Sequence, residues 1–514
     1  MKCLLRALLL AAALAPAAAL AAAPAPSASP SASPPPQTSG ETPDAVTDHT
    51  VVVGGRSIAY TARAGTIALT NAKDEPTARV FYTAYTAGGS DRPVTFLYNG
   101  GPGSSTMWLR MGSVGPVRVL AGDGKPSGPP PYRIADNPYS ILDRTDLVFI
   151  DMPDSGFGRI VGAGTTKAFF GVDQDVAAFA QFIERYITRF HRWNSPKFLF
   201  GESYGTTRTA ALAAALQDRG IPLNGVVLQS TILNFGLDYT NGDPIASGDW
   251  PYVLYLPTEA ATAWYHGKIP GKPQLAGFID RVERFAVGDY LSALYQGARL
   301  SPAERERVAR ELAGYLGVST QYVLTSNLRV PYSRFQQELL RSEGVVVGRL
   351  DSRYQTYSLD RATNEGPPWD PTDSSIDGPY TTAVNAYLRD DLKYETPLQY
   401  RANIYDIIYT PPSSWDFTHN GNPSTNVAPD LAYAMTQNPS LKVFSANGYY
   451  DFATPFFATQ YTLTHLNVAP ALRSNITFGF YEAGHMIYLS DAALAQYQRD
   501  LERWYDSALK GSGV

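Results

Sequence analysis

The sequence predicts an α/β fold in which a mostly parallel sheet carries helices on both faces. Three observations lead to this prediction. Short, uniformly apolar segments are typical of buried parallel strands, and they occur at 94–98, 147–151, 198–200, 226–228, 441–446 and 476–481. Helical patterns at 171–190 and 206–217 separate several of these strands. Shorter strand patterns at 51–53, 57–61, 66–70 and 78–85 precede them. Together they indicate a doubly wound sheet that begins with an antiparallel region.

The first 44 residues are not expected to belong to the fold. Lys2 and Arg6 precede an apolar run from Leu8, and small residues close it at Ala21 and Ala23, which is the pattern of a secretory signal peptide over residues 1–23. Residues 24–44 are rich in Pro, Ala and Ser and too poor in apolar bulk to fold, so they are interpreted as a linker. No later apolar run is long enough to span a bilayer. We therefore expect secretion across the inner membrane, to the periplasm or the exterior, without a membrane anchor.

Composition and charge exclude several classes of function. Cleavage removes the single cysteine, Cys3, and two positive charges, so the net charge changes from −5 to −7 and no disulfide remains. A chain without a basic excess is not expected to bind nucleic acid. No paired-histidine motif and no Gly-Lys-Ser/Thr sequence occurs, so neither a metal centre nor a Walker A site is predicted. No cofactor is expected, and the oligomeric state cannot be read from the sequence.

The character of the chain changes between about residues 236 and 394, where helical patterns dominate. Ser301-Pro302-Ala303-Glu304 is a capping box with proline at the first helical position. Further helices are expected at 334–341 and 381–388, and a short hairpin at 344–357. We interpret residues 236–394 as a mainly helical insertion, or cap, over the C-terminal edge of the sheet. The core of the fold is then expected to comprise residues 45–235 and 395–514.

A candidate nucleophile lies between a predicted strand and an Ala-rich helical segment. The motif is Gly201-Glu202-Ser203-Tyr204-Gly205, a G-x-S-x-G sequence in the setting of a nucleophile elbow. In such a turn the residues two before and two after the serine nearly touch, so both must be small. The serine hydroxyl then lies at a helix N-terminus, which favours developing negative charge. The same residues also occur in ordinary Gly-rich turns, so the interpretation depends on the rest of the chain.

A nucleophilic serine needs a base and a group that holds the base in the right tautomer. In α/β-hydrolases the order is Ser, Asp, His, on loops that follow successive strands. Of the six histidines, only His485 follows the last predicted strand, and the preceding strand leads to Asp451. Asp430 and Asp491 are rivals, but both stand at expected helix starts, where Asp is an ordinary N-cap. We predict Ser203 as nucleophile, His485 as general base and acid, and Asp451 as the orienting group.

The oxyanion of an acyl-transfer reaction needs backbone donors from two places. One is the N–H of Tyr204, directly after the nucleophile. The other is expected in the loop Asn99-Gly-Gly-Pro-Gly-Ser-Ser105, where glycines let a backbone N–H, that of Gly101, point at the oxyanion.

Together these motifs resemble the serine carboxypeptidase family, of the carboxypeptidase Y and wheat carboxypeptidase type. The similarity covers roughly residues 90–235 and 440–490, and the insertion stands at the family's usual place. The resemblance implies a bacterial secreted member with an α/β-hydrolase fold, whose substrates are peptides. It also implies that C-terminal residues are released through an acyl-enzyme, and that Asn99 and Glu202 bind the substrate's carboxylate.

The chain departs from the family pattern at two positions. Ser104 stands where the family usually has a cysteine. Ser113 stands where the family has a second glutamate that pairs with the first and reads the carboxylate with it. The sequence does not show whether this change alters the strict carboxypeptidase specificity. If Arg110 faces the site, it could neutralise Glu202 or bind the substrate's carboxylate itself. An esterase or acyltransferase with the same triad, or a catalytically silent binding module, stays an alternative. The preferred side chain of the substrate cannot be read from the sequence.

Overall fold

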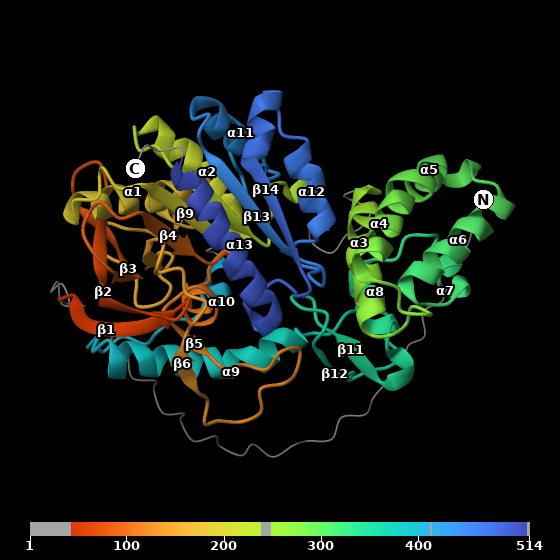
Figure 1. The fold of residues 1–514 in the computed structure, drawn as a ribbon. Helices are drawn as coiled ribbons and strands as arrows, with labels where there is room; N and C mark the ends of the chain where they lie inside the picture. Colours follow the sequence, from red (N-terminus) through yellow and green to blue (C-terminus); the bar gives the residue numbers. More distant parts are fainter. Residues whose placement is uncertain (1–42, 238–247, 412–413, 511–514) are drawn as a thin grey trace, which may run out of the picture. The chain divides into compact units, whose positions relative to one another are not determined.

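The computed structural model describes residues 43–237, 248–411 and 414–510. The expected signal peptide, 1–23, and the expected linker up to residue 42 lie outside the described residues. Within them, a ten-stranded sheet has the order β1-β2-β3-β7-β4-β9-β10-β13-β14, with β8 paired to β3 (Figure 1). Its strands are β1 (Ala45–Val53), β2 (Arg56–Thr70), β3 (Pro76–Thr86), β4 (Val94–Tyr98), β7 (Asp146–Ile150), β8 (Arg159–Ile160), β9 (Lys197–Glu202), β10 (Gly225–Gln229), β13 (Lys442–Gly448) and β14 (Ile476–Tyr481).

The sheet has an antiparallel and a parallel part. β1, β2, β3 and β7 pair antiparallel, and from β7 through β4, β9, β10, β13 and β14 the neighbours are parallel. The antiparallel part differs from the sequence prediction in one place, because 57–61 and 66–70 belong to one strand, β2. Gly65 lies inside that strand at a close approach: a Cβ there would lie 2.0 Å from Oδ1 of Asp44.

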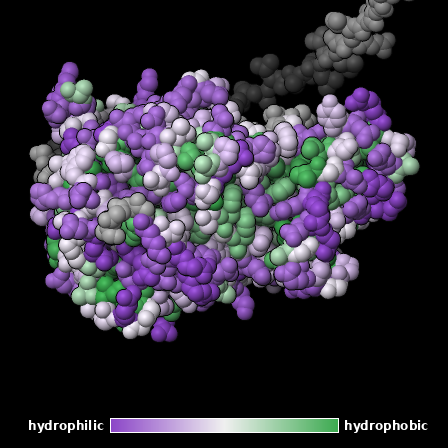
Figure 2. Space-filling model, turned by 45° about the horizontal axis from the view of Figure 1, so that its top comes forward, coloured by the Kyte–Doolittle hydropathy of each residue, from purple (hydrophilic) through white to green (hydrophobic). Residues whose placement is uncertain are grey.

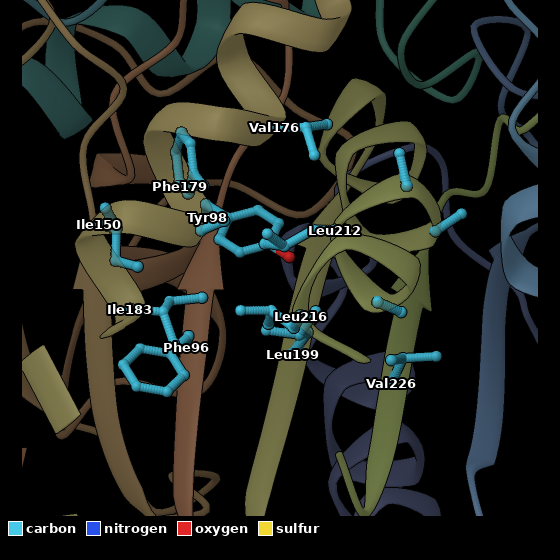
Figure 3. Packing of buried hydrophobic residues seen from close by; sticks show 14 of the residues in the cluster. Phe96, Tyr98, Ile150, Val176, Phe179, Ile183, Leu199, Leu212, Leu216 and Val226 are labelled. Carbon is cyan, nitrogen blue, oxygen red and sulfur yellow. The ribbon is translucent and has the colours of Figure 1, made fainter. Parts of the chain in front are cut away.

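Helices cover both faces of the sheet. One face carries α1 (Val172–Arg189), α2 (Tyr204–Asp218) and α11 (Ala428–Gln437), and the other carries α13 (Asp491–Lys510). Alternate side chains of β4 serve the two faces, because side chains of a strand point to opposite sides. Phe96 and Tyr98 pack with Phe179 of α1 and Leu212 of α2 (Figure 3), whereas Leu97 belongs to the core on the α13 side.

The chain between β10 and β13 divides between two cores. Helices α3 to α8 and the hairpin strand β11 contribute to a hydrophobic cluster of their own. The later helix α9 instead adds Ile376, Tyr380 and Val384 to the sheet's core, and it lies beside the small β5-β6 sheet in Figure 1. The elements are α3 (Trp250–Tyr265), α4 (Leu275–Phe285), α5 (Leu291–Gln296), α6 (Pro302–Leu316), α7 (Thr320–Thr325), α8 (Tyr332–Glu338), β11 (Val345–Val347), β12 (Gln355–Tyr357), α9 (Pro371–Ala386), β5 (Val117–Val119) and β6 (Ile134–Asp136).

Of two helix starts in this region, one matches the sequence prediction and the other does not. Ser301 caps α6 as predicted, because its Oγ accepts a hydrogen bond of 3.2 Å from the Glu304 N–H. The helix expected at 381–388 begins ten residues earlier, at Pro371, where Asp370 caps it. Pro379 lies inside α9 and is buried; proline removes one backbone N–H from the helix, yet α9 continues through it to Ala386.

Large apolar side chains lie mainly in three buried clusters. Figure 2 shows a face on which hydrophilic side chains predominate and hydrophobic ones form smaller groups. Among the helices of the described ranges, none combines the length and the apolar character needed to cross a membrane.

Candidate active site

Ser203 occupies a strained turn between β9 and α2. Its backbone φ is 62° and its ψ is −131°, a combination that a residue with a side chain rarely adopts. A Cβ on Gly201 would lie 2.1 Å from the carbonyl oxygen of Gly205, so the turn closes only with glycine at 201. α2 begins at the next residue, Tyr204. The turn thus has the geometry that the G-x-S-x-G motif predicts.

His485 and Asp451 meet at the carboxyl ends of neighbouring parallel strands. Asp451 follows β13 and His485 follows β14, and Nδ1 of His485 lies 2.8 Å from Oδ2 of Asp451. The other oxygen of Asp451, Oδ1, accepts hydrogen bonds from the backbone N–H groups of Ala453 and Thr454, at 2.7 and 3.0 Å. The hydroxyl of Thr454 donates to Oδ2 at 2.6 Å. Three donors besides the imidazole therefore hold the Asp451 carboxylate in one orientation against the ring.

The electrostatics of the pair favour a charged imidazole. Burial disfavours the imidazolium, but the adjacent carboxylate of Asp451 outweighs burial and raises the pKa of His485 above 6.5. A base whose pKa is raised in this way can hold a proton taken from a neighbouring hydroxyl.

Neither rival aspartate contacts His485. Asp430 accepts a hydrogen bond from Nε2 of His419 at 3.0 Å, and Nδ1 of that ring lies 2.6 Å from Asp173. Asp491 pairs with Arg118 at 2.7 Å. The structure therefore brings Asp451, and not the rivals, to the predicted base.

The glycine-rich loop after β4 lies directly against the elbow. A Cβ on Gly100 would lie 2.4 Å from the backbone nitrogen of Tyr204, so the loop passes beside the N–H that follows Ser203. Gly101 has a φ of +107°, which favours glycine. Both predicted oxyanion donors, Gly101 and Tyr204, line a cavity of about 780 Å³ that Ser203 and His485 also line. Their roles stay predictions.

A buried ion pair holds this loop on α2. Arg208 is fully buried, and its Nε contacts Oδ2 of Asp175 at 2.7 Å. The same guanidinium donates to the backbone oxygen of Asn99 at 2.9 Å. Arg208 therefore links α1, α2 and the start of the glycine-rich loop. Arg208 was not identified from the sequence, although a charged residue in an Ala-rich buried helix was a usable signal.

Glu202 lies under the elbow with only 2% of its surface exposed. Its Oε1 accepts hydrogen bonds from Nδ2 of Asn99 at 2.7 Å and from the hydroxyl of Tyr488 at 3.3 Å, and its Oε2 accepts one from Nε2 of Gln229 at 2.7 Å. Burial raises the pKa of Glu202 to about 7, although the imidazole of His485 and these hydrogen bonds oppose the rise. Asn99 and Glu202 are thus hydrogen-bonded to each other and both line the cavity; that they bind a substrate's carboxylate stays a prediction.

Gln229 and Tyr488 were not identified from the sequence. Gln229 is a polar residue at the end of an apolar buried strand, which is a usable signal for a functional position. Tyr488 lies three residues after His485 in the short helix η10 (Ile487–Leu489), and aromatic residues in such loops carry no distinctive pattern.

Arg110 and Ser113, the two residues considered beside Glu202 in the sequence, have different surroundings. Arg110 is fully buried and donates to Thr83 at 2.7 Å and to the hydroxyl of Tyr400 at 3.1 Å. It does not line the cavity, so it is not placed to bind a substrate's carboxylate there. Ser113 is also buried, and its Oγ has no hydrogen-bond partner in the described part of the chain.

The expected insertion supplies one wall of the cavity, with Tyr332, Arg349, Trp369, Asp373 and Asp377 among its lining residues. Burial, followed by the neighbouring aspartates, raises the pKa of Asp373 to about 7. This wall is therefore acidic above that pH, with Arg349 as a cation in the same wall. No group of three or more metal-ligating side chains occurs within residues 43–237, 248–411 and 414–510.

The strand order and the strained turn after β9 define an α/β-hydrolase. Comparison with known proteins narrows the class, because residues 60–240 match the family described as serine carboxypeptidase. The chain is 28% identical over 172 residues to carboxypeptidase Y homolog A of Leptosphaeria maculans, and 31% identical over 133 residues to pheromone-processing carboxypeptidase kex1 of Pyrenophora tritici-repentis. Within residues 60–240 the chain is therefore similar to the serine carboxypeptidase family, and the curated relatives it matches there are carboxypeptidases.

These similarities cover only part of each protein. The two alignments span 32% and 25% of this chain, and 28% and 19% of the relatives, so the chain spans less than a third of the relatives' length. The matched range 60–240 contains Ser203 but neither Asp451 nor His485. Among solved structures, the proline iminopeptidase of Mycobacterium smegmatis aligns with a TM-score of 0.37 and 11% identity, covering 91% of this chain and all of that one.

Proposed function

We propose that this protein is a serine carboxypeptidase that releases C-terminal residues from peptides through an acyl-enzyme. The observation that carries the proposal is the 2.8 Å contact between Asp451 and His485, which lines the same cavity as Ser203. The buried pair of Asn99 and Glu202, which lines the same cavity, supports the choice of a carboxyl-terminal substrate.

The proposed reaction follows from these positions. Ser203 Oγ attacks the scissile carbonyl carbon while Nε2 of His485 takes the hydroxyl proton. Asp451 keeps the other ring nitrogen protonated and stabilises the imidazolium. The N–H groups of Gly101 and Tyr204 receive the oxyanion. His485 then gives its proton to the departing amine, and a water molecule, deprotonated by the same ring, hydrolyses the acyl-enzyme.

The carboxylate of the substrate meets Glu202 near neutral pH. An ionised Glu202 would repel it at short range, whereas a protonated Glu202 can donate a hydrogen bond to it. Because the pKa of Glu202 is about 7, a free-acid peptide should bind best below that pH. An ester or amide of the same peptide carries no such charge and should not share this dependence.

Two measurements test the proposal. A fluorophosphonate probe should label the wild-type protein and fail to label Ser203→Ala; absence of labelling in the wild type would exclude a serine hydrolase. Hydrolysis of a free-acid peptide, its C-terminal amide and its methyl ester should then be compared at pH 5 to 6. Equal or faster hydrolysis of the ester and the amide would favour an esterase over a carboxypeptidase.

The proposal includes export, on the pattern of residues 1–23 alone. The full-length gene product should be recovered outside the inner membrane with its N-terminus beginning after Ala21 or Ala23. N-terminal sequencing of that fraction checks this, and an intact Met1 in the exported protein would contradict it.

A further inference from the structure

Three hydrogen-bond donors surround the Glu202 carboxylate, and two of them are amides. Asn99 is held in one orientation, because its Oδ1 accepts the backbone N–H of Leu109 at 3.0 Å, so its Nδ2 must face Glu202. Gln229 presents Nε2 to the other oxygen. The third donor is the hydroxyl of Tyr488, at 3.3 Å from Oε1, on a side chain with only 1% of its surface exposed.

Phenol rings fill the space beside Gly112, the residue that precedes Ser113. A Cβ on the adjacent Gly112 would lie 2.3 Å from the hydroxyl oxygen of Tyr380 and 2.5 Å from the ring of Tyr488. Position 112 therefore admits only glycine while these rings are in place. In the part of the chain that the structure describes, the contacts of Glu202 are with neutral groups, and no second carboxyl hydrogen-bonds to it.

A phenol hydroxyl differs from a carboxyl as a neighbour of Glu202. Burial raises the pKa of Tyr488 well above 10, so its hydroxyl stays neutral in the working pH range. As a donor it stabilises the ionised form of its partner. It cannot share a proton with Glu202 in the way that a second acid does.

We propose that Tyr488 is a positioning residue that sets the upper pH limit for free-acid substrates, by hydrogen-bonding Glu202 and favouring its ionised form. The inference rests on the proposed function, because it concerns how that site discriminates a free carboxylate. Other titratable or charged groups act on the same carboxyl or line its cavity: His485 and Asp451 beyond the elbow, Tyr380 on α9, Tyr497 on α13, and Arg349, Asp370, Asp373 and Asp377 on the cavity wall.

The test removes one hydroxyl. In Tyr488→Phe the ring still fills the space beside Gly112, but the donor to Oε1 is lost. The ratio of kcat/KM for a free-acid peptide to that for its amide is measured from pH 5 to 9. In the variant, the midpoint at which this ratio falls should move upward by about 0.5 to 1 pH unit, so the ratio at pH 8 rises roughly 3- to 10-fold.

Tyr497→Phe is the matched control. Its hydroxyl is buried and has no hydrogen-bond partner among the described residues, and its ring belongs to the same core. This control should leave the midpoint where it is in the wild type. In the double variant Tyr488→Phe/Glu202→Gln the shift should vanish, because no titrating carboxyl remains at position 202.

The outcomes separate the inference from the proposed function. An unchanged or lowered midpoint in Tyr488→Phe would overturn the inference while the free-acid preference of the wild type stands. If the wild type hydrolyses neither substrate, the proposed function fails. The titration of Glu202 is then followed by its infrared carboxyl band, assigned by difference with Glu202→Gln. An upward shift of that titration in Tyr488→Phe supports the inference, and a titration without such a shift overturns the inference. If Tyr488→Phe does not fold, Tyr488→Met serves as the second variant, with the same expected direction.

Discussion

Replacing Asp451 by asparagine should disable the base without removing it. In the wild type, Oδ1 of Asp451 accepts two backbone N–H groups and Oδ2 faces Nδ1 of His485. An asparagine must keep its carbonyl oxygen toward those two N–H groups, so its amide nitrogen faces His485. Nδ1 then has to accept a hydrogen bond, and the ring proton moves to Nε2. A ring protonated at Nε2 cannot take the proton of Ser203.

The size of the effect follows from the tautomer. A base held in the wrong tautomer by this substitution costs about 10⁴ in kcat, or about 5 kcal/mol of transition-state stabilisation. The side-chain volume hardly changes, so the melting temperature should change far less than the rate. Because the Asp451 carboxylate raises the pKa of His485, the remaining activity should begin to rise at a lower pH than in the wild type.

The assay is steady-state hydrolysis of a free-acid peptide, together with the rate of fluorophosphonate labelling, which reports the nucleophile without a leaving amine. Thr454→Val is the matched control, because it removes the 2.6 Å hydroxyl donor to Oδ2 and leaves the carboxylate in place. The rate of hydrolysis by Thr454→Val should fall by no more than about tenfold. An Asp451→Asn enzyme within tenfold of the wild type, or one no worse than Thr454→Val, would refute the tautomer argument.

Four further predictions follow. Ser203→Ala and His485→Ala should each abolish nearly all turnover with no added loss in the double variant, since they act as one unit; additive losses in kcat would show that one is misassigned. Glu202 has a pKa of about 7, above its ordinary 4.5, so the folded state favours its protonated form and stability falls as the pH rises through that window. The free energy of unfolding of Glu202→Gln, measured in urea, should therefore rise by about 3 kcal/mol relative to that of the wild type between pH 5 and 8. A difference in free energy that stays constant over this range would contradict the prediction. Hydrogen bonds that the His419 ring donates to the Asp430 and Asp173 carboxylates raise the pKa of His419. The stability that His419 contributes is therefore complete below pH 6.5 and disappears as the pH rises through the raised value. Urea midpoints of wild type and His419→Gln should converge toward pH 9, and a gap that persists there would count against it. Finally, a peptide that carries a lysine should be hydrolysed faster than one with an uncharged side chain of equal length, and this preference should grow from pH 6 to 8 as Asp373 ionises. Asp373→Asn should flatten the growth of the preference.

Local sequence was sufficient to predict the elements whose geometry depends on a few adjacent residues. The turn at Ser203 is determined by steric contact between residues 201 and 205, which belong to one motif of five consecutive residues. The start of α6 depends on a hydrogen bond between Ser301 and Glu304, three residues apart. The strand order made His485 and Asp451 neighbours, because the carboxyl ends of adjacent parallel strands meet at one edge of a sheet.

Contacts between distant segments, in contrast, were decided only by the tertiary structure. No periodicity indicates that α9 packs on the sheet's core and not with α3 to α8, because both cores accept the same apolar residues. The direction of Arg110, toward Thr83 and Tyr400, depends on a partner 290 residues away. The surroundings of Glu202 combine Asn99, Gln229 and Tyr488, which are separated from it by 103, 27 and 286 residues. Residue type and spacing identify an acid beside a nucleophile, but which donors surround that acid, and hence its charge at neutral pH, depends on how the whole chain packs.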